Sequence, residues 1–462
     1  MKACDAIDYL GYSPEMVEHR RMVYQRSDEE DSVTDMYQTY VSIGSMPEGF
    51  ASVFESAHDV LLVDKHVVCT SDTEESEGDM AAKFPQSDSV FRIVSKTCHP
   101  GHFMLKIDQL GTTKTREIKR ALVKSRKGYS LLSSEMYFKA LGKFDQRKSR
   151  SRKFIVYDTE KGLSSDLKPR TFWAFRCTCA RDLLKEWRDR PRPHGWPPCD
   201  VIEEVMEQEA QVVPVECSDR GRHKLEWRAC FVKGEFKLSE SLNEVQYKVF
   251  IILKSINKTR IQPLLPNMST YLVKNVVFWM VEREPQTSFR KENIYCLVRK
   301  GLQSMCTAIS SNCLQYYLIP GVNLLLEKID SRTKRKVVAV FDNLIKDGPR
   351  VLLKCPKLST AFTQMADDKL AEYGKARDKL EKLELYREHR VESVRSASRI
   401  QWEDTRSEDS VRTINCSEEQ MKRLCFKMND IVWPEWREFV EKELEATQVR
   451  ELLDIKIHQA LQ

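Results

Sequence analysis

The spacing of apolar residues changes part-way along the chain, and this change limits the folds that the chain can adopt. Before about residue 180, short apolar runs such as Val60–Val63, and the paired runs of residues 89–108 around Pro100-Gly101, indicate strands. After about residue 180, apolar residues recur every three or four positions, as they do on one face of a helix. The pattern therefore indicates an α+β chain, with strands before about residue 180 and helices after it.

Several helices can be placed from this pattern. One begins after Ser13, because Pro14 is well tolerated in the first turn of a helix. Two later helices have continuous apolar faces, which consist of Val245, Val249, Leu253 and Ile256, and of Leu272, Val276 and Met280. A further helical stretch is expected over residues 292–318.

The net charge of +6 conceals one strongly basic segment. Residues 112–153 contain 14 Lys or Arg against three acids, which is a local excess of +11. We expect a helix over residues 112–127, with a charged stripe that consists of Arg116, Arg120, Lys124 and Lys127. Such a stripe can follow the phosphate backbone of a nucleic acid, although many basic stripes are simply solvated helix faces.

Residues 346–462 are expected to form a charged helical C-terminal tail. Residues 367–397 alternate acids and bases and have few apolar positions, which favours a solvated helix over a coiled coil. Residues 398–416 are expected to be a linker, and a last helix is expected after Ser417. A tail of this kind is a candidate binding region for a protein partner.

The sequence has none of the features that typify membrane or secreted proteins. No apolar run reaches the ~18–20 residues needed to cross a bilayer, and the N-terminus has no apolar signal core. The 14 cysteines include no C-x-x-C pair, so we expect reduced thiols in a cytoplasmic protein, with the nucleus as the alternative compartment. We expect no membrane partner.

Cys98, His99 and His102 come closest to a metal-binding cluster. They surround the Pro100-Gly101 turn, but no fourth ligand is apparent, and structural zinc sites almost always have four. We therefore expect a packed corner between two strands and no zinc site.

Seven short segments follow one another in the order typical of a single protein family. They are Gly44–Phe50 (GSMPEGF), Cys98–His102 (CHPGH), Gly128–Glu135 (GYSLLSSE), His194–Pro197 (HGWP), Glu226–Phe231 (EWRACF), Thr270–Lys274 (TYLVK) and Tyr317–Leu325 (YLIPGVNLL). Together they resemble the Mab-twenty-one-like family, which includes cyclic GMP-AMP synthase and the animal cyclic GMP-AMP synthase-like receptors. The resemblance covers residues 8–330.

The resemblance implies a nucleotidyltransferase fold and a chain in three parts. Residues 1–193 would form a spine helix and the nucleotidyltransferase-like lobe, residues 194–345 the helical lobe, and residues 346–462 the tail. Active members of the family join ATP and GTP into a cyclic dinucleotide when they sense double-stranded nucleic acid, and they use two Mg²⁺ ions.

Nucleotidyl transfer of this kind places two divalent cations between three carboxylates and the triphosphate. The first two acids normally stand at i and i+2 on a strand, where both side chains face the same metals. Aligned with the family, this chain has Ala57 at the first position and Asp59 at the second, and the strand near Thr171 contains no acid. Asp59 is therefore the one retained metal ligand that we predict. The alternative is that the alignment is shifted and other acids serve.

Four further residues are candidates for nucleotide binding because of the resemblance. Gly44 and Ser45 would form the phosphate-binding turn, Tyr271 would stack on a base, and Lys254 would contact phosphate or base. The alternative is that Tyr271 only begins a helix and that Lys254 is solvated.

The leading hypothesis is a protein of this family with a degraded metal site, which binds a nucleotide or a double-stranded nucleic acid in regulation or innate sensing. The alternative is an active synthase that uses Mg²⁺ or Mn²⁺ to make a cyclic dinucleotide from ATP and GTP on sensing double-stranded RNA. The zinc-binding loop of the vertebrate synthase is not visible in residues 223–275, so RNA is favoured over DNA.

Overall fold

The computed structural model describes residues 3–56, 58–71, 84–94, 98, 101–113, 115–125, 128–148, 170–214, 223–325, 329–364 and 367–401. These residues fall into two compact units, and neither unit is a single stretch of chain. The larger unit comprises residues 36–43 and 59–359. The smaller unit comprises residues 1–35 and 44–58 together with the chain from residue 360 onward. The boundaries predicted after residues 193 and 345 both fall inside the larger unit.

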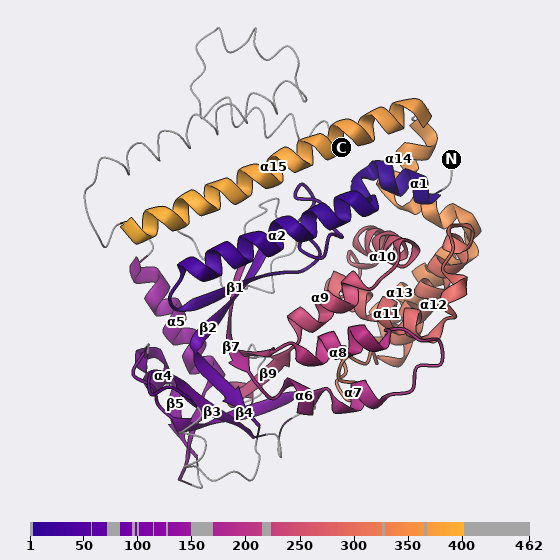
Figure 1. The fold of residues 1–462 in the computed structure, drawn as a ribbon. Helices are drawn as coiled ribbons and strands as arrows, with labels where there is room; N and C mark the ends of the chain where they lie inside the picture. Colours follow the sequence, from indigo (N-terminus) through magenta and orange to yellow (C-terminus); the bar gives the residue numbers. More distant parts are fainter. Residues whose placement is uncertain are drawn as a thin grey trace, which may run out of the picture. The chain divides into compact units, whose positions relative to one another are not determined.

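A nine-stranded sheet organises the described part of the larger unit (Figure 1). Its strands are β1 (Gln38–Ile43), β2 (Asp59–Thr70), β3 (Ser89–Val94), β4 (His102–Gln109), β5 (Leu122–Lys124), β6 (Ser130–Leu132), β7 (Arg170–Cys177), β8 (Ala210–Pro214) and β9 (Glu226–Cys230). The order is β1-β2-β7-β8-β9-β4-β6-β5, and β3 pairs with both β2 and β4. β2 runs antiparallel to β1 but parallel to β7 and β3, so the sheet is mixed.

The sheet is buried on both faces because apolar residues occupy both sides of its central strands. On one face, Leu61 and Val63 of β2 pack in a cluster with partly buried Val232, at the start of α9 (Val232–Glu240). On the other face, Tyr137 of α5 (Ser134–Lys148) packs edge-on against Phe175 of β7, with ring centroids 5.0 Å apart. The alternation of side chains along a strand thus places a helix over each face.

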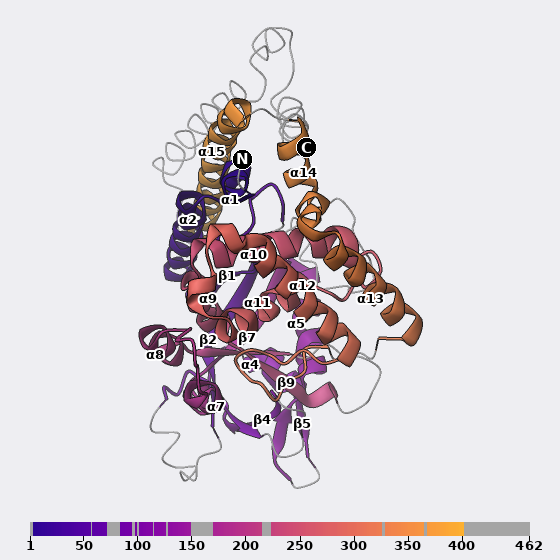
Figure 2. The ribbon, with the colours of Figure 1, turned by 90° about the vertical axis from the view of Figure 1, so that its right-hand side faces the viewer.

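The other helices of the larger unit, drawn in Figure 2, include the two that were predicted from continuous apolar faces. They are α4 (Thr115–Ala121), α6 (Ala180–Leu183), α7 (Lys185–Asp189), α8 (Cys199–Glu207), η2 (His223–Leu225), α10 (Glu244–Ile256), η3 (Asn257–Ile261), α11 (Thr270–Arg283), η4 (Gln286–Ser288), η5 (Lys291–Asn293), α12 (Ile294–Ser311), α13 (Ser331–Lys346), η6 (Gly348–Lys354) and the first part of α14 (Pro356–Gln364). All seven residues of the two predicted faces on α10 and α11 are buried, which confirms that periodicity.

Two helical predictions are wrong. β8 and β9 are strands inside the range predicted to be helical, because they pair with each other and with β7 and β4. The helix predicted over residues 292–318 ends at Ser311. Asn312 takes a left-handed conformation with φ 52°, and Gln315 then bridges to Asn323. Asparagine is one of the few residues that tolerates this conformation at a helix end.

The smaller unit is built around two long helices that lie side by side, although they are far apart in the sequence (Figure 1). They are α2 (Pro14–Thr34) and α15 (Asp367–Gln401), and α1 (Ala3–Ile7) and the π-helix η1 (Asp8–Tyr12) precede α2. The Ser13 hydroxyl caps α2 by accepting the Met16 N–H at 3.3 Å, as the Ser-Pro sequence predicted.

The expectation of a solvated tail helix is wrong for α15. Its charged residues Arg377, Glu381 and Glu384 are 4%, 0% and 7% exposed. They are buried within the smaller unit, where Arg20 of α2 supplies a counter-charge. The predicted linker over residues 398–416 lies mostly outside the described residues, and the predicted last helix lies wholly outside them.

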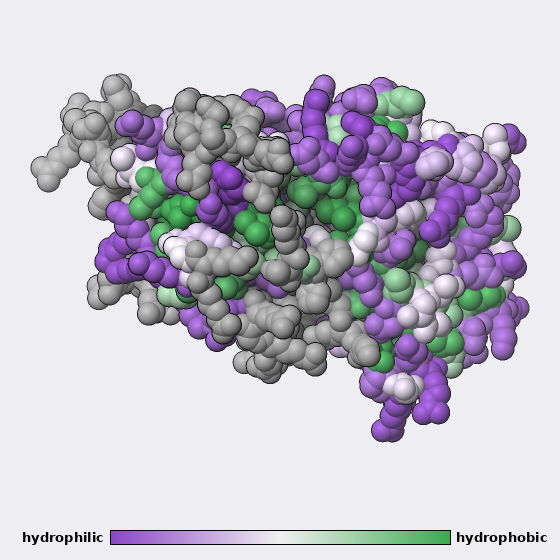
Figure 3. All heavy atoms as spheres, turned by 90° about the horizontal axis from the view of Figure 1, so that it is seen from below, coloured by the Kyte–Doolittle hydropathy of each residue, from purple (hydrophilic) through white to green (hydrophobic). Residues whose placement is uncertain are grey.

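The surface of the described residues is mainly hydrophilic on the side shown in Figure 3, with smaller apolar patches between polar side chains. Among the described helices, none is both long and apolar enough to cross a membrane.

Candidate functional site

The Gly44-Ser45 turn follows β1 directly and forms part of the smaller unit. Gly44 has φ 91°, and no heavy atom lies within 4 Å of the position that a Cβ would take. The turn is closed by the Phe50 N–H, which donates to the Ser45 carbonyl at 2.7 Å. Because only glycine adopts this φ without strain, the turn presents an open backbone that a phosphate could approach closely.

Asp59 begins β2, at a register position between Ile43 of β1 and Arg170 of β7. Further along this face, β2 continues with Leu61 and Val63 in an apolar cluster. β7 holds no acid along its length. The neighbouring positions of Asp59 in the sheet are therefore an apolar residue and a basic one, where a metal site would need further carboxylates.

The other acids near the start of β2 are engaged elsewhere. Glu55 accepts a hydrogen bond from the Tyr12 hydroxyl within the smaller unit. Asp64 is buried and accepts the backbone N–H of His66 at 2.8 Å. Ala57, which aligns with the first acid, lies outside the described residues. Across the described part of the chain, no group of three His, Cys, Asp or Glu side chains is arranged to hold a metal ion.

A second polar cluster centres on Glu235 of α9 in the larger unit. Lys274 Nζ lies 2.6 Å from Glu235 Oε2, and the hydroxyls of Tyr271 and Tyr316 donate to Oε1 at 2.9 and 2.7 Å. Burial, with the nearby carboxylate, raises the pKa of both tyrosines well above its usual value, so both stay protonated donors at neutral pH. One cation and two hydroxyls thus satisfy this carboxylate.

Tyr271 and Lys254, the two predicted base and phosphate contacts, differ in their surroundings. Tyr271 lies in the first turn of α11 and keeps 39% of its surface exposed, while its hydroxyl binds Glu235. The ring is therefore fixed at one end and accessible at the other, as a stacking platform requires. Lys254 lies near the end of α10 and is half-buried.

The prediction from sequence selected Tyr271 but missed the residues that hold it. Lys274 could have been found, because it lies one helical turn after Tyr271 on the same face of α11. Glu235 and Tyr316 are 81 residues apart and meet only through folding, so no local pattern could have joined them.

The predicted basic stripe over residues 112–127 is wrong as one helical face. The helix α4 gives way to the strand β5 at Leu122. Arg116 and Arg120 are exposed on α4, Lys124 is exposed on β5, and Lys127 lies outside the described residues.

A β-hairpin explains why the helix stops. β5 pairs antiparallel with β6, with Leu122 opposite Leu132. The turn between them contains Gly128 at φ 86°, and the Ser125 N–H donates to the Tyr129 carbonyl at 2.8 Å. Since pairing satisfies the backbone groups as a helix would, the hairpin replaces the expected helical continuation.

The predicted nucleotide and metal residues do not all belong to one compact unit. Gly44 and Ser45 belong to the smaller unit, whereas Asp59, Lys254 and Tyr271 belong to the larger one. The binding role of these five residues stays a prediction.

Comparison with known protein families gives one match. Residues 246–343, which run from α10 into α13, match the Mab-21 protein HhH/H2TH-like domain. A search of the curated proteins finds no match for the chain. The matched range is the helical part of the larger unit, including the two apolar helix faces that the sequence predicted.

Proposed function

We propose that this chain, which belongs to the Mab-21 family, is a nucleotidyltransferase-type protein that binds a nucleotide but lacks the metal site needed to transfer one. ATP and GTP are the candidate ligands, and double-stranded RNA is the favoured macromolecular one. Binding, rather than turnover, would then be the event that carries information, in a regulatory or sensing role in the cytoplasm or nucleus.

The register around Asp59 carries this proposal. Two-metal transfer needs several carboxylates directed at one pair of cations about 3.5–4 Å apart. Asp59 has Ile43 and Arg170 at its neighbouring register positions, and an apolar surface follows on the same face. Because β7 contains no acid along its length, Asp59 would have to hold both metals without a carboxylate from that strand.

Two features, one in each unit, support nucleotide binding. In the smaller unit, the exposed backbone of the turn at Gly44 can accept phosphate oxygens without a metal. In the larger unit, the exposed part of the anchored Tyr271 ring can accept a base. In the alternative, active form, Asp59 would be the protein's contribution to holding Mg²⁺ or Mn²⁺.

Two matched glycine variants test nucleotide binding, one in the proposed binding turn and one elsewhere as a control. Gly44 and Gly128 are matched because they have nearly the same φ, 91° and 86°, and equally open surroundings. We expect Gly44→Ala to lower ATP affinity by about tenfold, since alanine at this φ costs ~1–2 kcal/mol and shifts the turn. Gly128→Ala carries the same strain in the β5–β6 hairpin and should leave ATP affinity unchanged. Isothermal titration with ATP is the measurement, and a wild-type protein that binds neither ATP nor GTP would contradict the proposal.

A further inference from the structure

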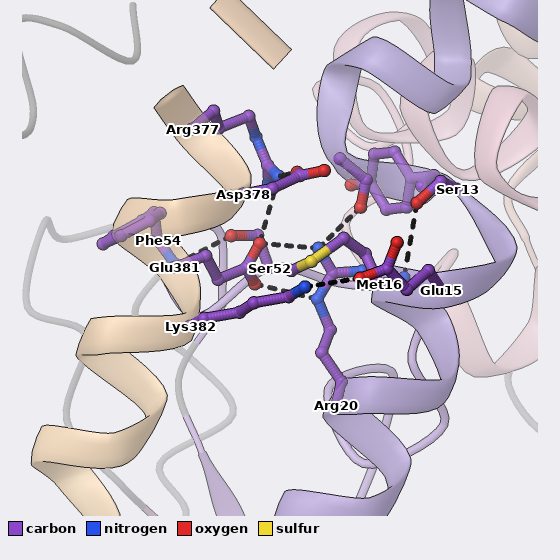
Figure 4. A network of polar contacts seen from close by, with 12 residues as sticks. Ser13, Glu15, Met16, Arg20, Ser52, Phe54, Arg377, Asp378, Glu381 and Lys382 are labelled. Atoms are coloured by element: carbon purple, nitrogen blue, oxygen red, sulfur yellow. Dashed lines mark hydrogen bonds and ion pairs between the residues drawn. The ribbon is translucent and has the colours of Figure 1, made fainter. Parts of the chain in front are cut away.

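A buried ionic cluster joins α15 to the loop that carries the Gly44-Ser45 turn (Figure 4). Glu381 of α15 and Arg20 of α2 are both fully buried, and Arg20 Nη2 lies 2.6 Å from Glu381 Oε2. A second arginine, Arg377, lies 3.0 Å from the same oxygen. All of these residues belong to the smaller unit, as does the loop of residues 44–58.

Arg20 uses its whole guanidinium fork in this cluster. Nε and Nη2 donate to the two oxygens of Glu381 at 2.8 and 2.6 Å. Nη1 donates to the Gly49 carbonyl at 2.9 Å, and Nη2 also donates to the Gly11 carbonyl at 2.6 Å. A planar, bidentate pairing of this kind fixes orientation as well as distance, and lysine cannot reproduce it.

Glu381 also reaches the loop directly. Its Oε1 accepts the backbone N–H of Val53 at 3.2 Å. Together with the bond from Arg20 to Gly49, this contact fixes the loop at two points that are four residues apart. Both points lie downstream of the turn that begins at Gly44.

Apolar contacts hold the same loop from the same two helices. Met46, Ala51 and Val53 form a buried cluster with Tyr24 of α2 and Leu385 of α15. The side of the loop that faces the helices is therefore immobilised, whereas Gly44 at its start is exposed. A loop fixed on one side and open on the other is a preorganised binding element.

We infer that Glu381 is a positioning residue for the Gly44–His58 loop, so that α15 forms part of the support of the nucleotide-binding turn. The inference rests on the proposed nucleotide-binding function for the role of the turn. The restraint of the loop by Glu381 does not depend on that function and can be measured separately.

The experiment compares Glu381→Gln with Lys382→Met in the full-length chain. Glu381→Gln keeps the size of the side chain but places an amide N–H group against two guanidinium groups. Lys382→Met removes an ion pair of 2.6 Å with Glu15, which joins the same two helices at the surface. It therefore controls for general loosening between α15 and α2. Arg20→Lys serves as a second variant should Glu381→Gln fold poorly, because it keeps the charge and loses the fork.

Two measurements are made on each variant, namely hydrogen exchange at the Val53 and Phe50 amides and affinity for ATP. In Glu381→Gln and Arg20→Lys, we expect Val53 exchange to rise by about tenfold or more, because hydrogen bonds to charged groups are among the stronger ones. ATP affinity should fall by about tenfold as the turn loses its support. Lys382→Met should match the wild type in both measurements.

The outcomes separate the inference from the proposed function. Unchanged Val53 exchange and unchanged ATP affinity in a folded Glu381→Gln protein would overturn the inference. Faster exchange with a wild type that binds no nucleotide would support the restraint of the loop by Glu381 and contradict the proposed function alone. Equal loosening in Lys382→Met would also overturn the inference, since the effect would then not be specific to Glu381.

Discussion

The strand pair β2–β7 and the helix pair α2–α15 each pair an acid with an arginine, by backbone register in the strands and by side-chain contact in the helices. Asp59 stands opposite Arg170 at the start of β2, next to an apolar face and without a further carboxylate in register. Glu381 is fully buried, and two arginines and a backbone amide satisfy it. The first arrangement is poorly suited to a metal, and the second is well suited to holding a loop. This difference supports the proposal of a nucleotide-binding protein that lacks the acids needed for transfer.

The largest expected difference between the two acids is in how much each stabilises the fold. Glu381→Ala leaves Arg20 and Arg377 buried without their carboxylate, so we expect the smaller unit to lose ~3–5 kcal/mol of unfolding free energy. Asp59→Asn, at a partly exposed strand end, should cost less than Glu381→Ala, because Asp59 is not fully enclosed. Urea denaturation followed by fluorescence measures both, and similar losses for the two variants would break the comparison.

Acid should weaken the smaller unit through His58, which packs against Tyr24 with ring centroids 4.9 Å apart. Burial lowers the pKa of His58 from 6.5 to about 4. A depressed pKa means that the unfolded chain binds the proton first, so stability is complete above pH 6.5 and falls as the pH drops towards 4. The loss should be about 3 kcal/mol.

The control for this pH dependence is His58→Phe, which keeps the aromatic contact and cannot titrate. Its stability should fall less than that of the wild type below pH 6.5, and the remaining loss should come from His19, whose pKa is also lowered by burial. Burial raises the pKa of Glu381, but attraction to Arg20 and Arg377 outweighs burial and leaves the pKa below 4.5, so its contribution is lost only in more acidic solution. An unchanged pH profile in His58→Phe would show that another group is responsible.

Variants of the Glu235 cluster should lose less unfolding free energy than Glu381→Ala. They test a second buried carboxylate against that of Glu381. Tyr316→Phe removes a fully enclosed donor to a charged acceptor, so we expect a loss of ~1.5–3 kcal/mol. Tyr271→Phe removes a donor to the same oxygen, but from a residue that is 39% exposed, and should cost less. Thermal unfolding of the two variants measures the difference. A larger loss of stability in Tyr271→Phe than in Tyr316→Phe would contradict the difference in burial between the two tyrosines.

The smallest expected effect is on binding to double-stranded RNA by the basic residues of α4 and β5. Reversing Arg120 and Lys124 to Glu should weaken binding to double-stranded RNA and reduce the salt slope by about two, because each lost phosphate contact lowers it by about one. Reversing the exposed Lys369 and Lys375 of α15 changes the net charge equally and should have little effect. RNA affinity measured at several salt concentrations tests this prediction. Identical salt slopes for the two double variants would show that Arg120 and Lys124 do not form an RNA-binding site.

Local chemistry made part of the fold predictable. Ser13 and Pro14 marked the start of α2, and the periodic apolar faces of α10 and α11 lie where they were predicted. The strands β3 and β4 flank the predicted Pro-Gly turn. Each of these features depends on residues close together in the sequence, so a pattern within one element was enough.

Features that depend on distant partners were not predictable in this way. Arg377 and Glu381 resembled solvated residues because their partner Arg20 lies 361 positions from Glu381. Lys124 fitted a helical stripe as well as a strand, and only its pairing with residues 130–132 decides between them. The absence of an acid on β7 was visible in the sequence, but the position of Arg170 beside Asp59 needed the register.

Turnover is the most direct test of whether this protein binds nucleotide without transferring it. Purified full-length protein is incubated with ATP, GTP, Mg²⁺ or Mn²⁺ and double-stranded RNA, and products are separated by chromatography while nucleotide binding is measured in the same samples. We expect bound nucleotide and no cyclic dinucleotide under any of these conditions. A cyclic dinucleotide that forms with the wild type and disappears with Asp59→Asn would contradict the proposed loss of catalysis.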